Sequence, residues 1–379
     1  MTARLPSDLL DRSAQESSRL LALSYLDQID RARDRLGDVS DKNALHDFRV
    51  GIRRLRSAVK AYRDALEGSV TGKTRRRLRK LARATNDGRD TEVQLAWLEK
   101  QPERLAPDEI PGFFWLVGRL EDRKQKTHDR AVVDVVRRYA KLSGKLRRAL
   151  GILRIELQTG QSQRLPTFRE ETGALTRSQV AAVRDELGRI QGSGDADQAH
   201  RTRIAVKRLR YLLEPITRRN RRAGALVRRF KEAQDILGEH HDMHVLSSAI
   251  SALRSSASTG TLGLDSGLAT VARLAENAAV SAFDRFQSIW GGEPGNRILT
   301  RVEELGKALE EEVTSQDEAV ATRESRVASQ EMEVESGKPR VMSKESPAPG
   351  GSETKAVNTP DLVVTGTEAL RTELATRDS

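Results

Sequence analysis

The stretch HDFRVGIRRLR, residues 46–56, combines five basic side chains with an apolar pattern typical of a helix. Phe48, Ile52 and Leu55 recur every three or four positions, which predicts that one helix face is buried. A related stretch, HRTRIAVKRLR, occupies residues 200–210, 154 positions later. Two copies of one pattern at a fixed separation predict a duplicated helical unit.

A second pair of blocks supports the duplication. LRKLARATNDGRDTEV at residues 78–93 resembles FKEAQDILGEHHDMHV at residues 230–245, with a shift of 152. Because both pairs occur in the same order with nearly the same gap, we expect two helical halves. These halves would cover about residues 16–165 and 170–312.

The basic residues of each copy share one face of the predicted helix. At about 100° per residue, those of the first copy occupy an arc of roughly 100°, nearly opposite the apolar positions. They are His46, Arg49, Arg53, Arg56, Lys60 and Arg63. The second copy repeats the arc with His200, Arg203, Lys207 and Arg210. Glu214 and Thr217 replace Lys60 and Arg63, so its far end is less positive.

These stripes are unusual because residues 46–63 and 200–213 place no acidic side chain on the same face. Like charges three or four positions apart repel each other, so an external anion is a natural counter-charge. Arginine matches phosphate oxygens with a planar fork, and lysine adds a point charge. The alternative is a solvated basic surface. For Arg54 and Arg208, on the other flank, we expect solvent exposure or a salt bridge.

The composition favours an all-α protein without disulfides. The 379 residues are 37% hydrophobic, 32% charged and only 4% aromatic, and cysteine is absent. Helical periodicity predominates, and turn-forming residues divide residues 16–312 into eight or nine predicted helices. The breaks fall near residues 37–43, 68–74, 86–90, 101–112, 159–166, 192–197, 238–240, 255–263 and 291–295. No apolar run suits a membrane span, and no signal peptide is evident, so we expect a cytoplasmic protein.

Charge is unevenly distributed along the chain. From Arg301 onward there are 10 Lys/Arg and 17 Asp/Glu residues, a net charge of −7 within a total of +11. The first 300 residues therefore carry +18, which indicates a polyanionic partner such as nucleic acid, a phosphate polymer or an anionic membrane. Residues 313–379 are poor in aromatic residues, and we expect a disordered acidic tail there.

The paired motifs H-D-F-R-V-G-I-R-R-L-R and H-R-T-R-I-A-V-K-R-L-R resemble those of the CHAD domain, the conserved histidine α-helical domain. The resemblance covers about residues 10–305, within an expected domain at 1–312. It implies two four-helix bundles related by pseudo-two-fold symmetry, with a basic central cavity. It also implies binding of inorganic polyphosphate and association with polyphosphate granules. The implied binding residues are His46, Arg49, Arg53, Arg56, His200, Arg203, Lys207 and Arg210, with Arg79 and Lys231 as further contributors; Lys60 and Arg63 extend the first stripe.

Other functions are less well supported. His240 and His244 share a helix face near Asp242, but the HExxH metal-ligand spacing is missing. We favour instead a loop-to-helix junction at which Asp90 and Asp242 cap the following helix. No cofactor or catalytic motif is recognisable, so we expect a binding protein and not an enzyme, although a metal-dependent phosphohydrolase is a further alternative. Nucleic acid is the alternative ligand, but the chain has few aromatic residues for base stacking. Nothing in the sequence indicates an oligomeric state.

Overall fold

The computed structural model describes residues 5–38, 40–41, 43–85, 89–152, 165–256 and 263–311. The chain divides into two units, residues 1–322 and 323–379. The predicted tail at 313–379 lies outside the described residues. Within the described ranges every regular element is a helix, which confirms the all-α fold class. None of the helices in these ranges is both long enough and apolar enough to cross a membrane.

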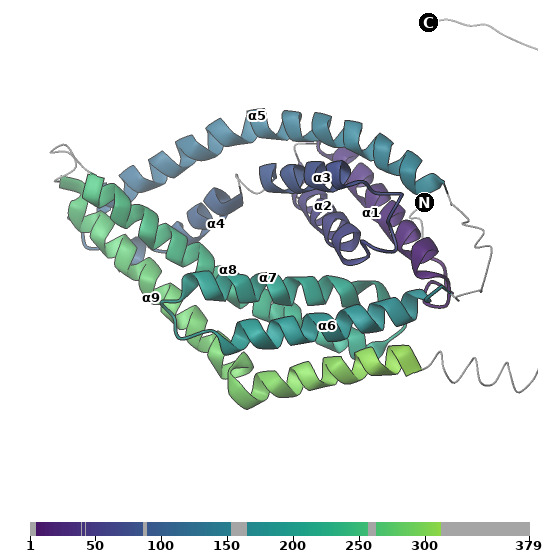
Figure 1. The fold of residues 1–379 in the computed structure, drawn as a ribbon. Helices are drawn as coiled ribbons and strands as arrows, with labels where there is room; N and C mark the ends of the chain where they lie inside the picture. Colours follow the sequence, from purple (N-terminus) through teal and green to yellow (C-terminus); the bar gives the residue numbers. More distant parts are fainter. Residues whose placement is uncertain are drawn as a thin grey trace, which may run out of the picture. The chain divides into compact units, whose positions relative to one another are not determined.

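The helices divide between the two predicted halves of the chain (Figure 1). The first half contains α1 (Ala14–Arg35), α2 (Ala44–Ala61), α3 (Gly72–Ala84), α4 (Arg89–Leu98), the short 3₁₀ helix η1 (Pro102–Arg104) and α5 (Ile110–Gly151). The second half contains α6 (Phe168–Gly188), α7 (Ala196–Leu213), the 3₁₀ helix η2 (Glu214–Ile216), α8 (Arg221–Ser256), α9 (Asp265–Trp290) and a helix at 292–311.

The two halves differ in where their long helices are interrupted. The 18-residue helices α2 and α7 begin 152 positions apart, as the repeat predicts. The segment that forms α3 and α4 in the first half is the single helix α8 in the second. Conversely, α5 is continuous, whereas α9 ends at Trp290 and a new helix starts at 292. Gly292 has a φ of 56°, a left-handed conformation that favours glycine, so the predicted break near 291–295 is confirmed.

The starts of α1 and α6 pair with each other. The hydroxyl of Ser13 caps α1 and that of Thr167 caps α6, and these residues form an isolated antiparallel bridge. The Ala14 N–H donates to the carbonyl of Pro166 at 2.9 Å, and the Phe168 N–H donates to that of Arg12 at 2.8 Å. Ala14 and Phe168 are 154 positions apart, and so are Arg12 and Pro166. The shift of the sequence repeat therefore converts each of these hydrogen bonds into the other. Such an exchange is expected if the halves are related by a two-fold axis, but their symmetry as two four-helix bundles stays a prediction.

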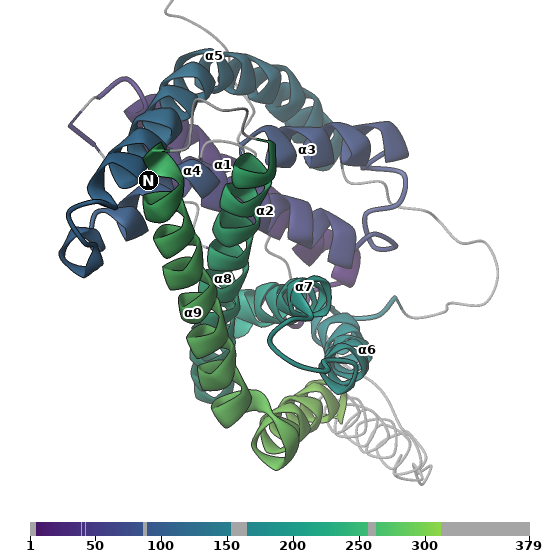
Figure 2. The same ribbon diagram turned by 90° about the vertical axis from the view of Figure 1, so that its left-hand side faces the viewer.

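The predicted apolar faces form the core. Phe48, Ile52, Leu55, Val59, Tyr62 and Leu66 are each at most 1% exposed, and Val206, Leu209, Leu213 and Ile216 are fully buried. One core cluster contains residues from both halves. A second cluster joins α4, the start of α5, α8 and α9, and Figure 2 shows the long helices α8 and α9 side by side. The 3.6-residue period of the sequence therefore identified the buried side of both cationic helices.

Two predictions about α8 are wrong. We predicted a break at residues 238–240, but α8 continues through this segment. Asp242 consequently lies inside the helix and does not cap one. Glycine at a helix interior costs only about 1 kcal/mol, and here the missing side chain has a packing role. A Cβ at Gly238 would lie 3.3 Å from a guanidinium nitrogen of Arg203, so the glycine allows Arg203 to lie against α8.

Candidate functional site

The two cationic helices α2 and α7 pack against each other near the middle of the fold (Figure 1). α3 packs against α2, and α8 packs against α7. Basic side chains from three of these helices act on one another electrostatically, and we call this group the cationic cluster. Its members are Arg53, Arg56 and Lys60 of α2, Arg79 and Arg83 of α3, and Arg203, Lys207, Arg208 and Arg210 of α7.

Lys207 is the most strongly perturbed cation of the cluster. Burial, followed by the positive charges of Arg203, Arg53, Arg56 and Arg210, lowers the pKa of its ammonium group to about 7. An amine with this pKa is partly neutral at physiological pH. The shift therefore reports burial first, with an added contribution from the positive charges around Lys207.

The same crowding extends to the exposed side of the cluster. Burial lowers the pKa of Arg56, and the charges of Arg83, Arg208 and Arg79 lower it further. Lys60 has a pKa lowered by burial and then by Arg208 and Arg56. Within the described part of the chain, Arg56, Lys60 and Arg208 form no ion pair with a carboxylate. These three cations thus lack an internal counter-charge in that part of the chain.

Carboxylates do neutralise the margins of the predicted stripes. Arg49, only 8% exposed, donates to Glu92 of α4 at 3.0 Å. Glu214 accepts from Arg54 at 2.8 Å, and it lies 3.5 Å from Nε of Arg210. The salt bridge expected for Arg54 is therefore confirmed. Glu92 and Glu214 therefore reduce the positive charge at the margins of the stripes.

Three other predicted residues lie at or beyond the edge of the cluster. Arg63 follows the end of α2 and is exposed, with Nε 4.0 Å from a carboxylate oxygen of Asp64. Lys231 on α8 is exposed and donates to Asp235 at 3.0 Å. His46 is exposed at the start of α2. The structure therefore does not bring these three into the group around Lys207.

The predicted histidine of the second copy has a partner from α8. The rings of His200 and His241 are 4.5 Å apart. Burial and then Arg203 and Lys207 lower the pKa of His200, while burial and then His200 lower the pKa of His241 to about 4. Both rings are consequently neutral at pH 7 and contribute hydrogen-bonding groups in place of charge.

The HHDMH segment has a structural role in α8. His240 is 1% exposed, and its Nδ1 lies 3.0 Å from the carbonyl oxygen of Ala279. The His240 and His244 rings are 6.3 Å apart. Across the described ranges, no group of three or more His, Asp or Glu side chains is arranged to hold a metal ion.

Arg83 and Arg208 belong to the cluster although the sequence did not single them out as ligand contacts. Arg208 lies on the flank of the α7 wheel, but its charge acts on Arg56 and Lys60 of the neighbouring helix. A helix wheel describes one helix alone, so it cannot show that Arg208 of α7 lies near Arg56 and Lys60 of α2. Arg83 follows Arg79 by four positions on α3, a spacing that could have identified it.

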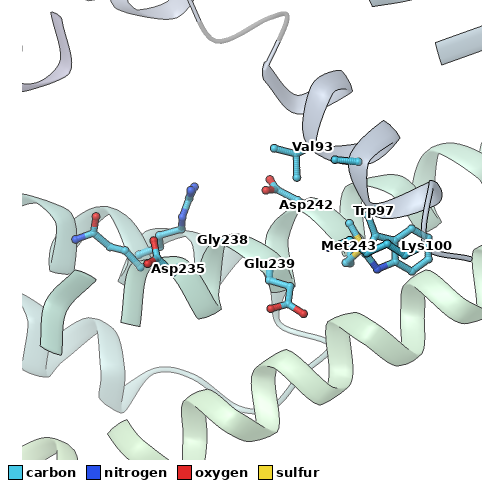
Figure 3. A pocket seen from close by; sticks show the side chains of 11 residues that line it. Val93, Trp97, Lys100, Asp235, Gly238, Glu239, Asp242 and Met243 are labelled. Carbon is cyan, nitrogen blue, oxygen red and sulfur yellow. The ribbon is translucent and has the colours of Figure 1, made fainter. Parts of the chain in front are cut away.

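A pocket of about 490 Å³ lies beside the cluster, between α4 and α8 (Figure 3). Arg203 lines it together with Lys100, but so do three carboxylates, of Asp235, Glu239 and Asp242. This pocket therefore has mixed charge and differs from the predicted basic central cavity, which stays a prediction.

A family search identifies residues 21–251 as a CHAD domain. The chain belongs to the CHAD family. Its fold is similar to the crystal structure of the CHAD domain from the plant Ricinus communis, with a TM-score of 0.54 and 20% identity, over 81% of this chain and 96% of that one. It is also similar to PptA from Streptomyces chartreusis, with a TM-score of 0.57 and 14% identity, over 74% and 100% of the two chains. The comparison with curated protein sequences found no match. At these identities the solved structures establish the shared fold.

Proposed function

We propose that this CHAD domain binds inorganic polyphosphate through the cationic cluster. The observation that carries the proposal is the grouping of basic side chains from α2, α3 and α7, in which Arg56, Lys60 and Arg208 pair with no carboxylate of the described residues. Burial, followed by the charges of the neighbouring arginines, also lowers the pKa of Lys207 to about 7. Such crowding destabilises the free protein, and a polyanion would relieve it. Membership of the CHAD family is consistent with this ligand.

A chain of phosphates suits the cluster better than one small anion. α2 and α7 each present basic residues along a helix face, so the positive charges are distributed along two rods. Guanidinium groups can bind phosphate oxygens in a bidentate manner, while lysine supplies charge without fixed geometry. Binding releases the counterions condensed on the polyanion, as it does for nucleic acids.

Charge reversal in the centre of the cluster tests the proposal. Arg56→Glu combined with Arg208→Glu should reduce affinity for long-chain polyphosphate at least a hundredfold, because neither residue forms an internal ion pair in the described ranges. The matched control is Arg301→Glu with Lys307→Glu, an equal charge change at exposed positions of the helix at 292–311. Affinity is measured by fluorescence anisotropy at about 150 mM salt.

Competition with RNA and duplex DNA in the same assay distinguishes the ligands. We expect polyphosphate to displace either nucleic acid, because the cluster is rich in phosphate-binding groups and only 4% of the chain is aromatic and able to stack on bases. Equal or tighter binding of nucleic acid would favour that function instead. Unchanged polyphosphate affinity in the cluster variant would refute the assignment of the site.

We further propose binding without hydrolysis and association with cytoplasmic polyphosphate granules. Glu92 and Glu214, the carboxylates at the margins of the cluster, accept from Arg49 and Arg54, and such ion pairs make a carboxylate a weaker base toward water. Incubation with polyphosphate and Mg²⁺ or Mn²⁺ should release no phosphate beyond that of a protein-free sample. A fluorescent fusion should colocalise with granules, and the cluster variant should lose that localisation.

A further inference from the structure

The pocket beside the cationic cluster has an apolar end and a polar end. Trp97 of α4 packs against the core cluster that contains Met243 of α8, and Val93 lines the same region. Figure 3 shows Trp97 and Met243 at the opposite end of the pocket from Asp235. Its volume of about 490 Å³ is within the usual range for small-molecule sites. A flat, partly apolar group would fit the end at Trp97.

Arg203 connects this pocket with the cationic cluster. It lines the pocket, and its guanidinium group lies against Gly238 in the wall formed by α8. Its charge also contributes to the lowered pKa of Lys207. A ligand that extends past Arg203 would therefore pass from the pocket into the group of cations between α2 and α7.

The pocket also contains a buried donor with no partner. Gln234 is 8% exposed, and its Nε2 has no hydrogen-bond partner within the described residues. Leaving a buried amide unsatisfied costs about 1–3 kcal/mol. Farther along α8, Glu239 and Asp242 add carboxylate oxygens to the pocket lining, and one oxygen of Glu239 already accepts from Arg285 at 2.6 Å. Donor and acceptor groups thus lie in one cavity, and phosphate-binding groups lie next to it.

We propose that this pocket binds the nucleoside of a purine nucleoside polyphosphate, whose phosphates extend past Arg203 onto the cationic cluster. The inference rests on the proposed phosphate site and adds a ligand class to it. The purine stacks on Trp97, since aromatic rings bind the faces of bases. Gln234 donates to an acceptor of the nucleoside. Glu239 and Asp242 accept from ribose hydroxyls or an exocyclic amine, and their charge directs the phosphates toward Arg203.

Titration calorimetry on the full chain tests the inference with ATP, GTP, UTP and inorganic tripolyphosphate. ATP and GTP should bind at least about tenfold more tightly than tripolyphosphate, because stacking of one base supplies that much affinity. UTP has a smaller base, so its affinity should lie between that of the purine nucleotides and that of tripolyphosphate. Trp97→Ala should bring ATP to the affinity of tripolyphosphate and leave tripolyphosphate binding unchanged.

Two further variants make the result specific to the pocket. Trp115→Ala removes another partly buried tryptophan that packs against the same core cluster but does not line the pocket, so it should retain the preference for ATP. Ala96→Trp fills the pocket from an exposed position of α4, so it tests the site even if Trp97→Ala fails to fold. Circular dichroism checks the helicity of all three variants.

The outcomes separate this inference from the proposed function. If tripolyphosphate binds and ATP binds no more tightly, the nucleoside site is wrong and the phosphate site stands. A preference for ATP that persists in folded Trp97→Ala and Ala96→Trp also overturns the nucleoside site. If ATP, tripolyphosphate and long-chain polyphosphate all fail to bind, both proposals fail, whereas binding of long-chain polyphosphate alone overturns only the nucleoside site. If ATP binds and tripolyphosphate and long-chain polyphosphate do not, only the polyphosphate function is contradicted.

Discussion

Polyphosphate binding at pH 8 should be accompanied by proton uptake at Lys207. In the free protein, burial and the charges of Arg203, Arg53, Arg56 and Arg210 lower the pKa of this amine to about 7. A bound polyanion places negative charge beside the amine and favours its ammonium form. The pKa should then return toward its ordinary value of 10.5. Binding and protonation are therefore coupled.

The size of the effect follows from the two protonation equilibria. With a pKa of about 7, Lys207 is about 90% neutral at pH 8. If the bound pKa approaches 10, close to one proton is taken up for each site filled. A rise of about three pKa units corresponds to on the order of 4 kcal/mol of coupling between the proton and the polyanion. His200 and His241 contribute little at this pH, because their pKa values are lowered from 6.5.

Isothermal titration calorimetry in two buffers with different ionisation enthalpies measures this uptake. The difference in observed binding enthalpy divided by the difference in buffer enthalpy gives the number of protons. We expect about 0.9 proton for the natural chain and none for Lys207→Met, which has no titrating group there. Uptake near zero in the natural chain would refute the reasoning. An equal uptake in Lys207→Met would show that the proton binds elsewhere.

Three further predictions follow from other contacts. Glu214→Gln should lower the unfolding free energy by on the order of 2 kcal/mol in urea titrations, because it leaves the half-buried Arg54 without its carboxylate; an unchanged midpoint would contradict this. Gly267→Ala should lower the unfolding free energy by about 2–4 kcal/mol, because the new Cβ would lie 2.0 Å from the carbonyl oxygen of Glu109. The control Gly144→Ala adds a Cβ in open space, so it should leave the unfolding free energy unchanged or raise it. Raising salt from about 50 to 200 mM should weaken polyphosphate binding on the order of a thousandfold, and a flat response in anisotropy titrations would argue against an ionic site.

The buried faces could be predicted from the sequence because they depend on local spacing. The apolar period of α2 places Phe48, Ile52 and Leu55 on one side of the helix, and the same spacing recurs in α7. Each helix must bury this side, whatever surrounds it. The wheel does not decide the exposure of each basic residue opposite, since Arg49 is only 8% exposed.

Part of the neutralisation of the stripes could not be predicted, because two of the ion pairs join residues far apart in the chain. Glu92, which pairs with Arg49, lies 43 residues away on α4. Glu214, which pairs with Arg54, lies 160 residues away. A helix wheel of residues 46–63 contains neither acid. The tertiary fold thus decides which predicted cations are available to a ligand.

Packing between helices also explains the incorrect break in α8. Gly238 and the polar residues after it resemble a helix end in the sequence. In the fold, Gly238 is buried beneath the guanidinium group of Arg203, and the helix continues. A glycine that interrupts a helix and one that admits a neighbouring side chain have the same local sequence. Only the approach of α7 distinguishes them.

Lys207→Met distinguishes a binding role from a structural role of the cluster. The folded pKa of Lys207 is lower than the unfolded value, so the unfolded chain binds more protons between about pH 7 and 10.5. Stability of the free protein should therefore rise with pH across this window, by up to about 1.4 kcal/mol per unit. Removing the amine should stabilise the unliganded fold near pH 7 and flatten the pH dependence, while weakening polyphosphate binding. Urea unfolding from pH 7 to 9.5 measures the unfolding free energy of both chains, with Lys145→Met at an exposed position as control. A loss of both stability and binding in Lys207→Met would indicate that Lys207 serves the fold and not a ligand.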